Sequence, residues 1–276
     1  MQARWEGMTL DYDVLGYGQE VVVLLPALGM DRRMWWPQVE EFAEHYILLP
    51  IDTGGHDPVD GSADGPSLAR LAEAVVSVLD AVGIEHAHVV GISMGGMIAQ
   101  HLAATHQSRV RSLVLISTTP MYPTESREQL EQRATEVLRD GMETVTNSAL
   151  QRWFTSQFIT TSSTVVERIR RILLDSDPRS YAAGARAVAN VDTVSLLERI
   201  SSPTLLIRAD GDHSLPVDAF QLLSLIPASR IAHLENASHL CAVEAAEQCN
   251  ALFRDFWSSL SAHESWPDSL SPLSPW

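Results

Sequence analysis

The sequence VVGISMGG, residues 89–96, decides how the rest of this chain is interpreted. It contains Gly-x-Ser-x-Gly centred on Ser93, placed directly after an apolar run typical of a buried strand and before a stretch with helical spacing. A serine on such a turn has strained backbone angles, and the flanking glycines let neighbouring main chain pass closely. The pattern alone occurs often by chance, but in this setting it predicts an exposed nucleophile rather than a structural serine.

Short apolar runs on both sides of this motif predict a mostly parallel sheet. Each run is rich in Val, Ile and Leu without alternation, as is typical of strands covered on both faces. Strand and helix in alternation predict an α/β fold with a mostly parallel central sheet and helices on both faces. The predicted strands are residues 21–25, 46–51, 88–92, 113–117, 204–209 and 230–234, and the predicted helices are 68–82, 97–106, 219–226 and 241–260.

Residues 121–200 break this alternation. The segment is polar, has no convincing strand and is expected to form helices inserted between two core strands, as a helical lid over one edge of the sheet. The alternative is a second helical layer with no role at a site. The predicted domains are a core of residues 1–120 and 201–261, a lid of residues 121–200 and a flexible tail of residues 262–276. The predicted lid helices are 125–141, 144–158, 164–175 and 180–190.

A serine hydroxyl is a poor nucleophile until a base removes its proton, so an acid and a histidine should follow it in the chain. Asp212 comes directly after a predicted strand and four residues before Pro216, where the orienting carboxylate is expected. Asp210 is the rival for this role. An acid that merely caps the next helix fits Asp218 better.

His239 follows the last predicted strand, from which a base can reach back over the sheet edge. His213 is the competitor, although its position next to the predicted acid makes its geometry awkward. His86 and His88 form a His-x-His pair, but they point to opposite sides of a strand and no Cys or carboxylate cluster completes a metal site. The sequence therefore predicts Ser93, Asp212 and His239 as a catalytic triad, with no metal.

A tetrahedral intermediate needs two backbone donors for its oxyanion. One is expected to be the amide of Met94, the residue after the nucleophile. The other is expected from residues 26–30, the loop after the first core strand, with Leu28 as the donor. Gly29 permits a tight turn there, as it would in an ordinary surface loop.

With these residues identified, the chain resembles the α/β-hydrolase superfamily over residues 7–260 and, within it, the 3-oxoadipate enol-lactonase group. The similar stretches are LGMDRRMW at 28–35, VGISMGGMI at 90–98, RWFT at 152–155, YAA at 181–183 and HLCAVE at 239–244. Two stretches depart from the family pattern. Pro-Ala at 26–27 replaces the common His-Gly, and DTGGHD at 52–57 replaces Asp-x-Arg-Gly-x-Gly. These departures bear on the substrate more than on the reaction, and the resemblance implies no cofactor.

The resemblance also implies a largely apolar cavity beside the serine. It places Trp153 in the lid facing the nucleophile, and Trp35 or Trp36 near the oxyanion loop. Any one of the aromatic side chains could instead be core packing. Arg152 or Arg186 could pair with a substrate carboxylate or simply be exposed. The predicted lining is Met94 together with the substrate contacts Trp35, Tyr122, Trp153, Phe154 and Phe158.

Composition excludes several classes of protein. The 276 residues carry a formal net charge of −16, which opposes binding to nucleic acid or an anionic membrane. No segment resembles a signal peptide or approaches the roughly 20 apolar residues of a membrane-spanning helix. Cys241 and Cys249 fall in one predicted helix, about 12 Å apart, too far for a disulfide. Reduced thiols suit the cytoplasm, which is the expected location.

The predicted function is that of a serine hydrolase which cleaves a carboxylic ester or lactone of a small molecule through an acyl-enzyme. The alternatives on the same fold are a C–C bond hydrolase, a perhaloperoxidase-like enzyme, a biosynthetic cyclase, an acyltransferase or a non-catalytic small-molecule receptor. The sequence leaves open the substrate, a catabolic or biosynthetic pathway, and whether the chain forms a homo-oligomer.

Overall fold

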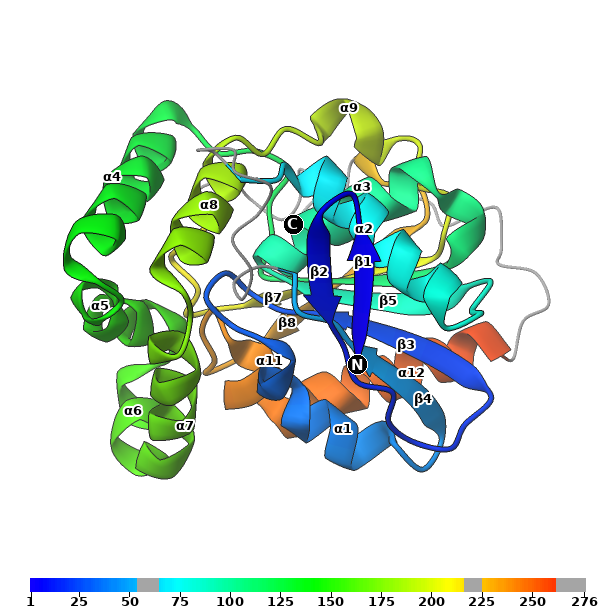
Figure 1. The fold of residues 1–276 in the computed structure, drawn as a ribbon. Coiled ribbons are helices and arrows are strands. Elements are labelled where there is room, and N and C mark those ends of the chain that lie inside the picture. The colour runs from blue at the N-terminus through cyan, green and yellow to red at the C-terminus, as the bar shows by residue number, and fades with distance from the viewer. Residues whose placement is uncertain (54–64, 216–224, 262–276) are drawn as a thin grey trace.

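Six parallel strands form the central sheet of this computed structural model, which describes residues 1–53, 65–215 and 225–261. These six, counted within the described ranges, are β3 (Glu20–Leu25), β4 (Tyr46–Pro50), β5 (Ala87–Ile92), β6 (Val110–Ile116), β7 (Thr204–Ala209) and β8 (Ser229–Leu234). They lie in the order β4-β3-β5-β6-β7-β8 (Figure 1). The predicted α/β class and all six predicted strands are confirmed, with small differences at their ends.

Helices cover both faces of the sheet, as its apolar strands require. They are α1 (Trp36–Phe42), α2 (Leu68–Ala81), α3 (Met94–Thr105), α11 (Cys241–Glu244) and α12 (Ala246–Ser261). Alternate residues of each strand enter different cores. Val22 and Leu24 pack with α1, α11 and α12, whereas Val23 and Leu25 pack with α2 and α3 on the opposite face (Figure 1).

The predicted single helix at 241–260 is wrong. The helix is interrupted at Ala245, whose φ of −117° and ψ of 47° are not helical, and α12 starts at the next residue. The thiol of Cys249 consequently lies 3.4 Å from the carbonyl oxygen of Cys241, much closer than a continuous helix would allow. Both cysteines are buried and free. The predicted separation of about 12 Å is wrong, because the thiol of Cys249 is hydrogen-bonded to Cys241.

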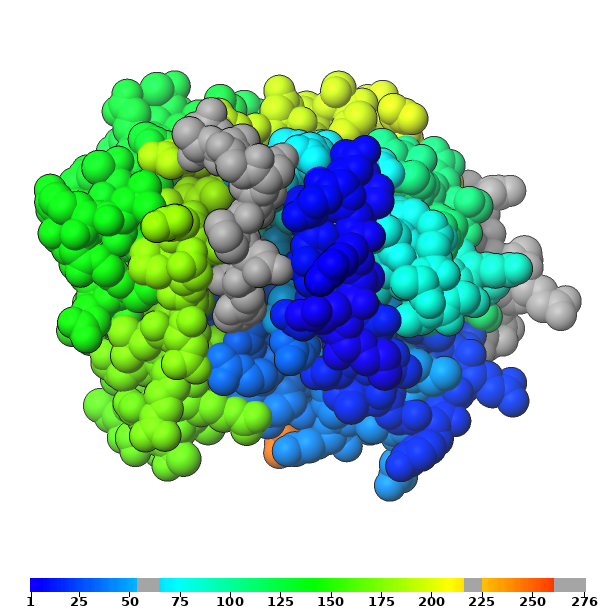
Figure 2. Space-filling model, viewed as in Figure 1, coloured from blue at the N-terminus to red at the C-terminus, as the bar shows by residue number. Residues whose placement is uncertain are grey.

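An antiparallel pair at the N-terminus was missed by the sequence reasoning. β1 (Gln2–Trp5) and β2 (Met8–Asp11) are joined through Glu6 and Gly7, which both have positive φ. Strands of four residues carry too few alternations to be distinguished from a loop. Figure 2 shows this pair (dark blue) crossing the face of the core beside α2.

Six helices of the described chain lie between β6 and β7, and we call residues 121–200 the lid segment. They are α4 (Thr124–Asp140), α5 (Glu143–Trp153), α6 (Ser156–Thr161), α7 (Ser163–Leu174), α8 (Pro178–Ala189) and α9 (Val194–Leu197). Helices α4 to α8 form one side of the molecule (green to yellow-green in Figures 1 and 2), and α9 lies at the top beside α3. The predicted helix at 144–158 is two helices, because Thr155 is extended and caps α6. That the segment acts as a lid stays a prediction.

Several predictions fall outside the described residues. These are the divergent loop at 54–57, the acid of Asp218 with most of the helix predicted at 219–226, and the tail at 262–276. Within the described ranges, no helix is long and apolar enough to cross a membrane.

Candidate active site

Ser93 lies on a strained turn between β5 and α3. Its φ of 53° and ψ of −117° place it among the few residues other than glycine with positive φ. Such strain persists only where the surroundings over-determine it. Here the Ser93 amide donates to the carbonyl of Ile116 at 2.9 Å, and the Thr118 hydroxyl donates to the Ser93 carbonyl at 2.9 Å.

The two glycines of the motif are required by close main-chain contacts. A Cβ atom on Gly91 would lie 2.3 Å from the carbonyl oxygen of Gly95, and one on Gly95 would lie 2.1 Å from that of Leu25. Neither leaves room for a side chain. The turn therefore packs backbone against backbone, both within itself and against the end of β3.

The predicted acid and base are brought together at the carboxyl end of the sheet. Asp212 follows β7 and His239 follows β8, and the Asp212 Oδ2 atom lies 2.9 Å from the His239 Nδ1 atom. Asp212 is 1% exposed, whereas its rival Asp210 is exposed. With Nδ1 bonded to the carboxylate, Nε2 of His239 is the ring nitrogen left for the cavity that it shares with Ser93.

Ser214 completes this cluster and was missed by the sequence reasoning. Its hydroxyl donates to Asp212 Oδ1 at 2.6 Å and lies 2.9 Å from His239 Nδ1, and its amide donates to the same Asp212 oxygen at 3.0 Å. Burial alone would raise the pKa of Asp212, but the attraction of His239 and the hydrogen bonds from His239 and Ser214 hold it well below its usual range. A hydroxyl two residues after an Asp is a common local partner, and this spacing was the available signal.

The predicted oxyanion donors lie on adjacent segments. Leu28 belongs to the loop after β3, and the Gly95 amide ties that loop to the turn of Ser93 by donating to the Pro26 carbonyl at 3.0 Å. In the part of the chain that the structure describes, the amides of Leu28 and Met94 donate to no protein acceptor. Two free amides beside a strained serine can hold a negatively charged oxygen.

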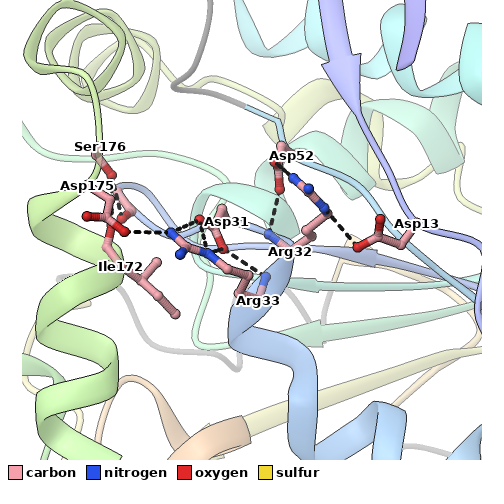
Figure 3. A network of polar contacts seen from close by, with 9 residues as sticks. Asp13, Asp31, Arg32, Arg33, Asp52, Ile172, Asp175 and Ser176 are labelled. Carbon is pink, nitrogen blue, oxygen red and sulfur yellow. Dashed lines mark hydrogen bonds and ion pairs between the residues drawn. The ribbon is translucent and has the colours of Figure 1, made fainter. Parts of the chain in front are cut away.

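A polar network holds the far end of this oxyanion loop on its core side (Figure 3). The guanidinium of Arg32 pairs with Asp52 and, at 2.8 Å, with Asp13, while the Arg32 amide donates to Asp52 at 2.5 Å. Asp52 is the first residue of the divergent DTGGHD stretch. Arg32 places a cation beside this aspartate.

The same network continues to the lid segment (Figure 3). Arg33 lies 2.7 Å from Asp31 and 3.1 Å from Asp175, which follows α7. The Ser176 hydroxyl donates to the carbonyl of Gly29 at 3.0 Å. The oxyanion loop is therefore bonded to the core at one side and to the lid segment at the other.

A cavity of about 260 Å³ joins these groups. Of the predicted residues, it is lined by Ser93, His239, Leu28, Tyr122 and Trp153. Its wall from α4 is polar, because Ser126, Gln129 and Arg133 follow each other at helical spacing and point to it together with Leu130. The cavity is consequently less apolar than the sequence predicted.

Other predicted contacts lie elsewhere. Trp35 has no exposed surface and belongs to the core. The guanidinium carbon of Arg168 lies 3.9 Å from the ring centre of Trp36. Phe154 and Phe158 stack on each other with ring centres 5.1 Å apart and do not line this cavity. The side chain of Met94 is also buried.

Two arginines face the cavity, and only one was considered from the sequence. Burial, and then repulsion from Arg133, lower the pKa of Arg152 to about 10 against the opposing influence of Tyr181. Tyr181 lies close to both cations; burial raises the pKa of its hydroxyl against their opposing attraction. Within residues 1–53, 65–215 and 225–261, neither guanidinium pairs with a carboxylate, whereas Arg186 pairs with Glu131 at 2.9 Å. Two such neighbouring cations favour an anionic ligand.

The described residues contain no group of three or more His, Cys, Asp or Glu side chains that could hold a metal ion. His88 of the His-x-His pair is buried and lies 2.7 Å from the hydroxyl of Ser112. Burial, with the nearby charge of Arg111 and then His86, lowers its pKa to about 3, so this imidazole is neutral core.

Comparison with known proteins agrees with this architecture. Residues 20–246 match the alpha/beta hydrolase fold family. The chain is 30% identical over 256 residues to 3-oxoadipate enol-lactonase 1 of Acinetobacter baylyi, covering 92% of this chain and 95% of that protein. It is 29% identical over 247 residues to enol-lactonase 2 of the same organism, covering 89% and 91%. The crystal structure of the enol-lactonase from Burkholderia xenovorans superposes with a TM-score of 0.87 at 28% identity, covering 94% of this chain and 100% of that one.

Proposed function

Because the chain belongs to the alpha/beta hydrolase fold family, it is a hydrolytic enzyme, and we propose that it cleaves a carboxylic ester or lactone of a small molecule through an acyl-enzyme on Ser93. One observation carries this proposal. A serine with positive φ shares a cavity with a histidine whose other ring nitrogen is bonded to a buried carboxylate. That is the arrangement required to activate a hydroxyl as a nucleophile.

In the first half of the reaction, His239 Nε2 takes the proton of the Ser93 hydroxyl while the Ser93 oxygen attacks the substrate carbonyl. The carbonyl oxygen becomes an oxyanion and accepts hydrogen bonds from the amides of Leu28 and Met94. Asp212, held ionised by its partners, stabilises the imidazolium of His239 and fixes its tautomer. The tetrahedral intermediate then breaks the bond to the leaving oxygen, which takes the proton from His239.

In the second half, a water molecule gives a proton to His239 and attacks the acyl carbon. The same two amides hold the second oxyanion. Its collapse breaks the bond to Ser93, whose oxygen recovers the proton from His239, so the enzyme returns to its starting state. For an ester, the alcohol leaves after the first half and the carboxylic acid after the second. For a lactone, the alcohol or enol oxygen stays attached to the acyl group, and a single ring-opened acid leaves. No cofactor is needed for either half.

The two arginines support a finer statement about the substrate. Arg133 and Arg152 present positive charge to the cavity, and a forked guanidinium matches the geometry of a carboxylate. The relatives named above are lactonases. The substrate that fits both observations is an ester or lactone that carries a free carboxylate.

The test is labelling and turnover in matched variants. Intact-protein mass spectrometry after exposure to a fluorophosphonate should show one adduct in the wild type and in Ser77→Ala, whose serine lies on α2 away from the cavity. Ser93→Ala should show none and should lose p-nitrophenyl acetate turnover. A Ser93→Ala protein that keeps near-normal turnover in a clean preparation would refute the assignment.

A further inference from the structure

Two stretches of the chain take no part in the proton transfers described above. They are RWFT at 152–155 in the lid segment and the residues after His239 in HLCAVE. The structure brings them into contact across 89 residues of sequence, between Thr155 and Glu244. The Leu240 amide donates to the Trp153 carbonyl at 3.0 Å, so the residue after the predicted base is bonded to the end of α5.

Glu244, at the end of α11, makes the strongest part of this contact. Its Oε1 atom accepts from the Thr155 amide at 2.9 Å and from the Thr155 hydroxyl at 2.5 Å. Its Oε2 atom accepts from the Ser238 amide at 2.7 Å. One carboxylate thus joins the residue before His239 to the residue that begins α6.

The hydroxyl of Ser238 adds a further contact. It lies 3.0 Å from the Arg152 carbonyl and 3.0 Å from the Gly211 carbonyl, next to Asp212. Residues on both sides of His239 are therefore bonded to the connection between α5 and α6. The last turn of α5, directly before that connection, presents the side chains of Arg152 and Trp153 to the cavity.

Only a carboxylate satisfies this arrangement fully. All three groups that reach Glu244 are N–H or O–H donors, and both of its oxygens are used. A glutamine would turn an NH₂ group toward at least one donor and would lose that bond. Hydrogen bonds to a charged acceptor are also stronger than neutral ones.

We propose that Glu244 is a positioning residue, which holds the loop of His239 against the lid segment so that the α5–α6 connection sets the place of the base. That His239 acts as a base rests on the proposed function. The hydrogen bonds of Glu244 to Thr155 and Ser238, which we call the tether, do not rest on it. In this arrangement the lid segment is part of the frame that aligns the reacting groups. It is more than a second helical layer.

The experiment compares Glu244→Gln with Thr155→Val, which removes the hydroxyl from the lid side, and Thr155→Ser, which keeps it. Glu131→Gln is the control, because it breaks an ion pair between α4 and α8 that touches neither loop. We expect kcat for p-nitrophenyl acetate to fall about 10- to 100-fold in Glu244→Gln, with less change in KM, since small misplacements of catalytic groups cost rates of this order. Thr155→Val should fall less, and Thr155→Ser and Glu131→Gln should stay near wild type.

Hydrogen exchange measured by mass spectrometry supplies a second readout that needs no turnover. Peptides covering residues 236–241 should exchange faster in Glu244→Gln and Thr155→Val than in the wild type. An unchanged kcat, an equal loss in Glu131→Gln, or unchanged exchange in both variants would overturn the proposal. If the wild type showed no Ser93-dependent turnover, the proposed function would fail, and exchange alone would then decide whether the tether exists. Should Glu244→Gln not fold, the two Thr155 variants decide the same question from the lid side.

Discussion

Replacing Arg152 by Met should weaken the preference of the enzyme for anionic esters. The side chain keeps nearly the same volume but loses its charge, so packing in the cavity wall is disturbed little. A hydrogen bond to a charged group contributes about 1.5–3 kcal/mol, which corresponds to about 10- to 150-fold in kcat/KM. Arg133 stays in place, and its repulsion of Arg152 is relieved. The lower part of that range, about 10- to 30-fold, is therefore expected.

The assay compares two esters of equal acyl length, p-nitrophenyl hydrogen glutarate and p-nitrophenyl pentanoate. Arg152→Met should lower kcat/KM for the anionic ester and leave the neutral one within about threefold. Arg152→Lys should restore part of the preference, because it keeps the charge but not the fork. Equal losses on both esters would refute the reasoning, since they would indicate altered shape rather than lost charge.

Two further predictions concern stability. Ser214→Ala removes one hydrogen bond to Asp212 and should lower the free energy of unfolding by about 1 kcal/mol at pH 7. The pKa of Asp212 in the folded protein lies well below the unfolded value of about 3.9, so the stability from this carboxylate is present above that pH and is lost as the pH falls through the folded pKa. Urea unfolding should therefore show wild type and Ser214→Ala both losing stability from pH 7 to pH 3 while the difference between them persists, and a difference that vanishes by pH 3 would contradict it. Gly95→Ala forces a methyl group to within 2.1 Å of the Leu25 carbonyl, and should cost about 2–3 kcal/mol in the same assay and abolish fluorophosphonate labelling. Normal stability and labelling would count against the packing argument.

The parts of the site that follow from local sequence were predictable. A glycine pattern at the end of an apolar run predicts a strand-to-helix turn. The structure has this turn, and Ser93 has the expected strained backbone, with a positive φ. The pairing of Asp212 with His239 also followed, because both come directly after parallel strands whose carboxyl ends meet at one edge. These features depend on residues that are neighbours in the chain or in the sheet.

The other features of the site depend on tertiary contacts between residues far apart in the sequence, which no short stretch of sequence contains. The spacing of Arg133 predicts a helix, but which face of α4 meets the cavity is decided by how α4 packs on α8. Trp35 and Phe154 are residue types that often line a pocket, yet both are buried in the hydrophobic core. The break at Thr155 was missed because the apolar spacing continues across it, while a distant carboxylate, Glu244, holds the extended residue in place.

The bonds that join residues 121–200 to both the oxyanion loop and the histidine loop have a consequence for how such enzymes diversify. The lid segment cannot be exchanged between relatives as an independent unit. A chimaera that received the lid segment of a relative would need a donor for the Gly29 carbonyl, as Ser176 is here, and a donor for the Glu244 carboxylate, as Thr155 is here. Substrate range in this lineage should therefore change through point substitutions inside the insert, at positions such as Gln129, more readily than through exchange of the whole segment.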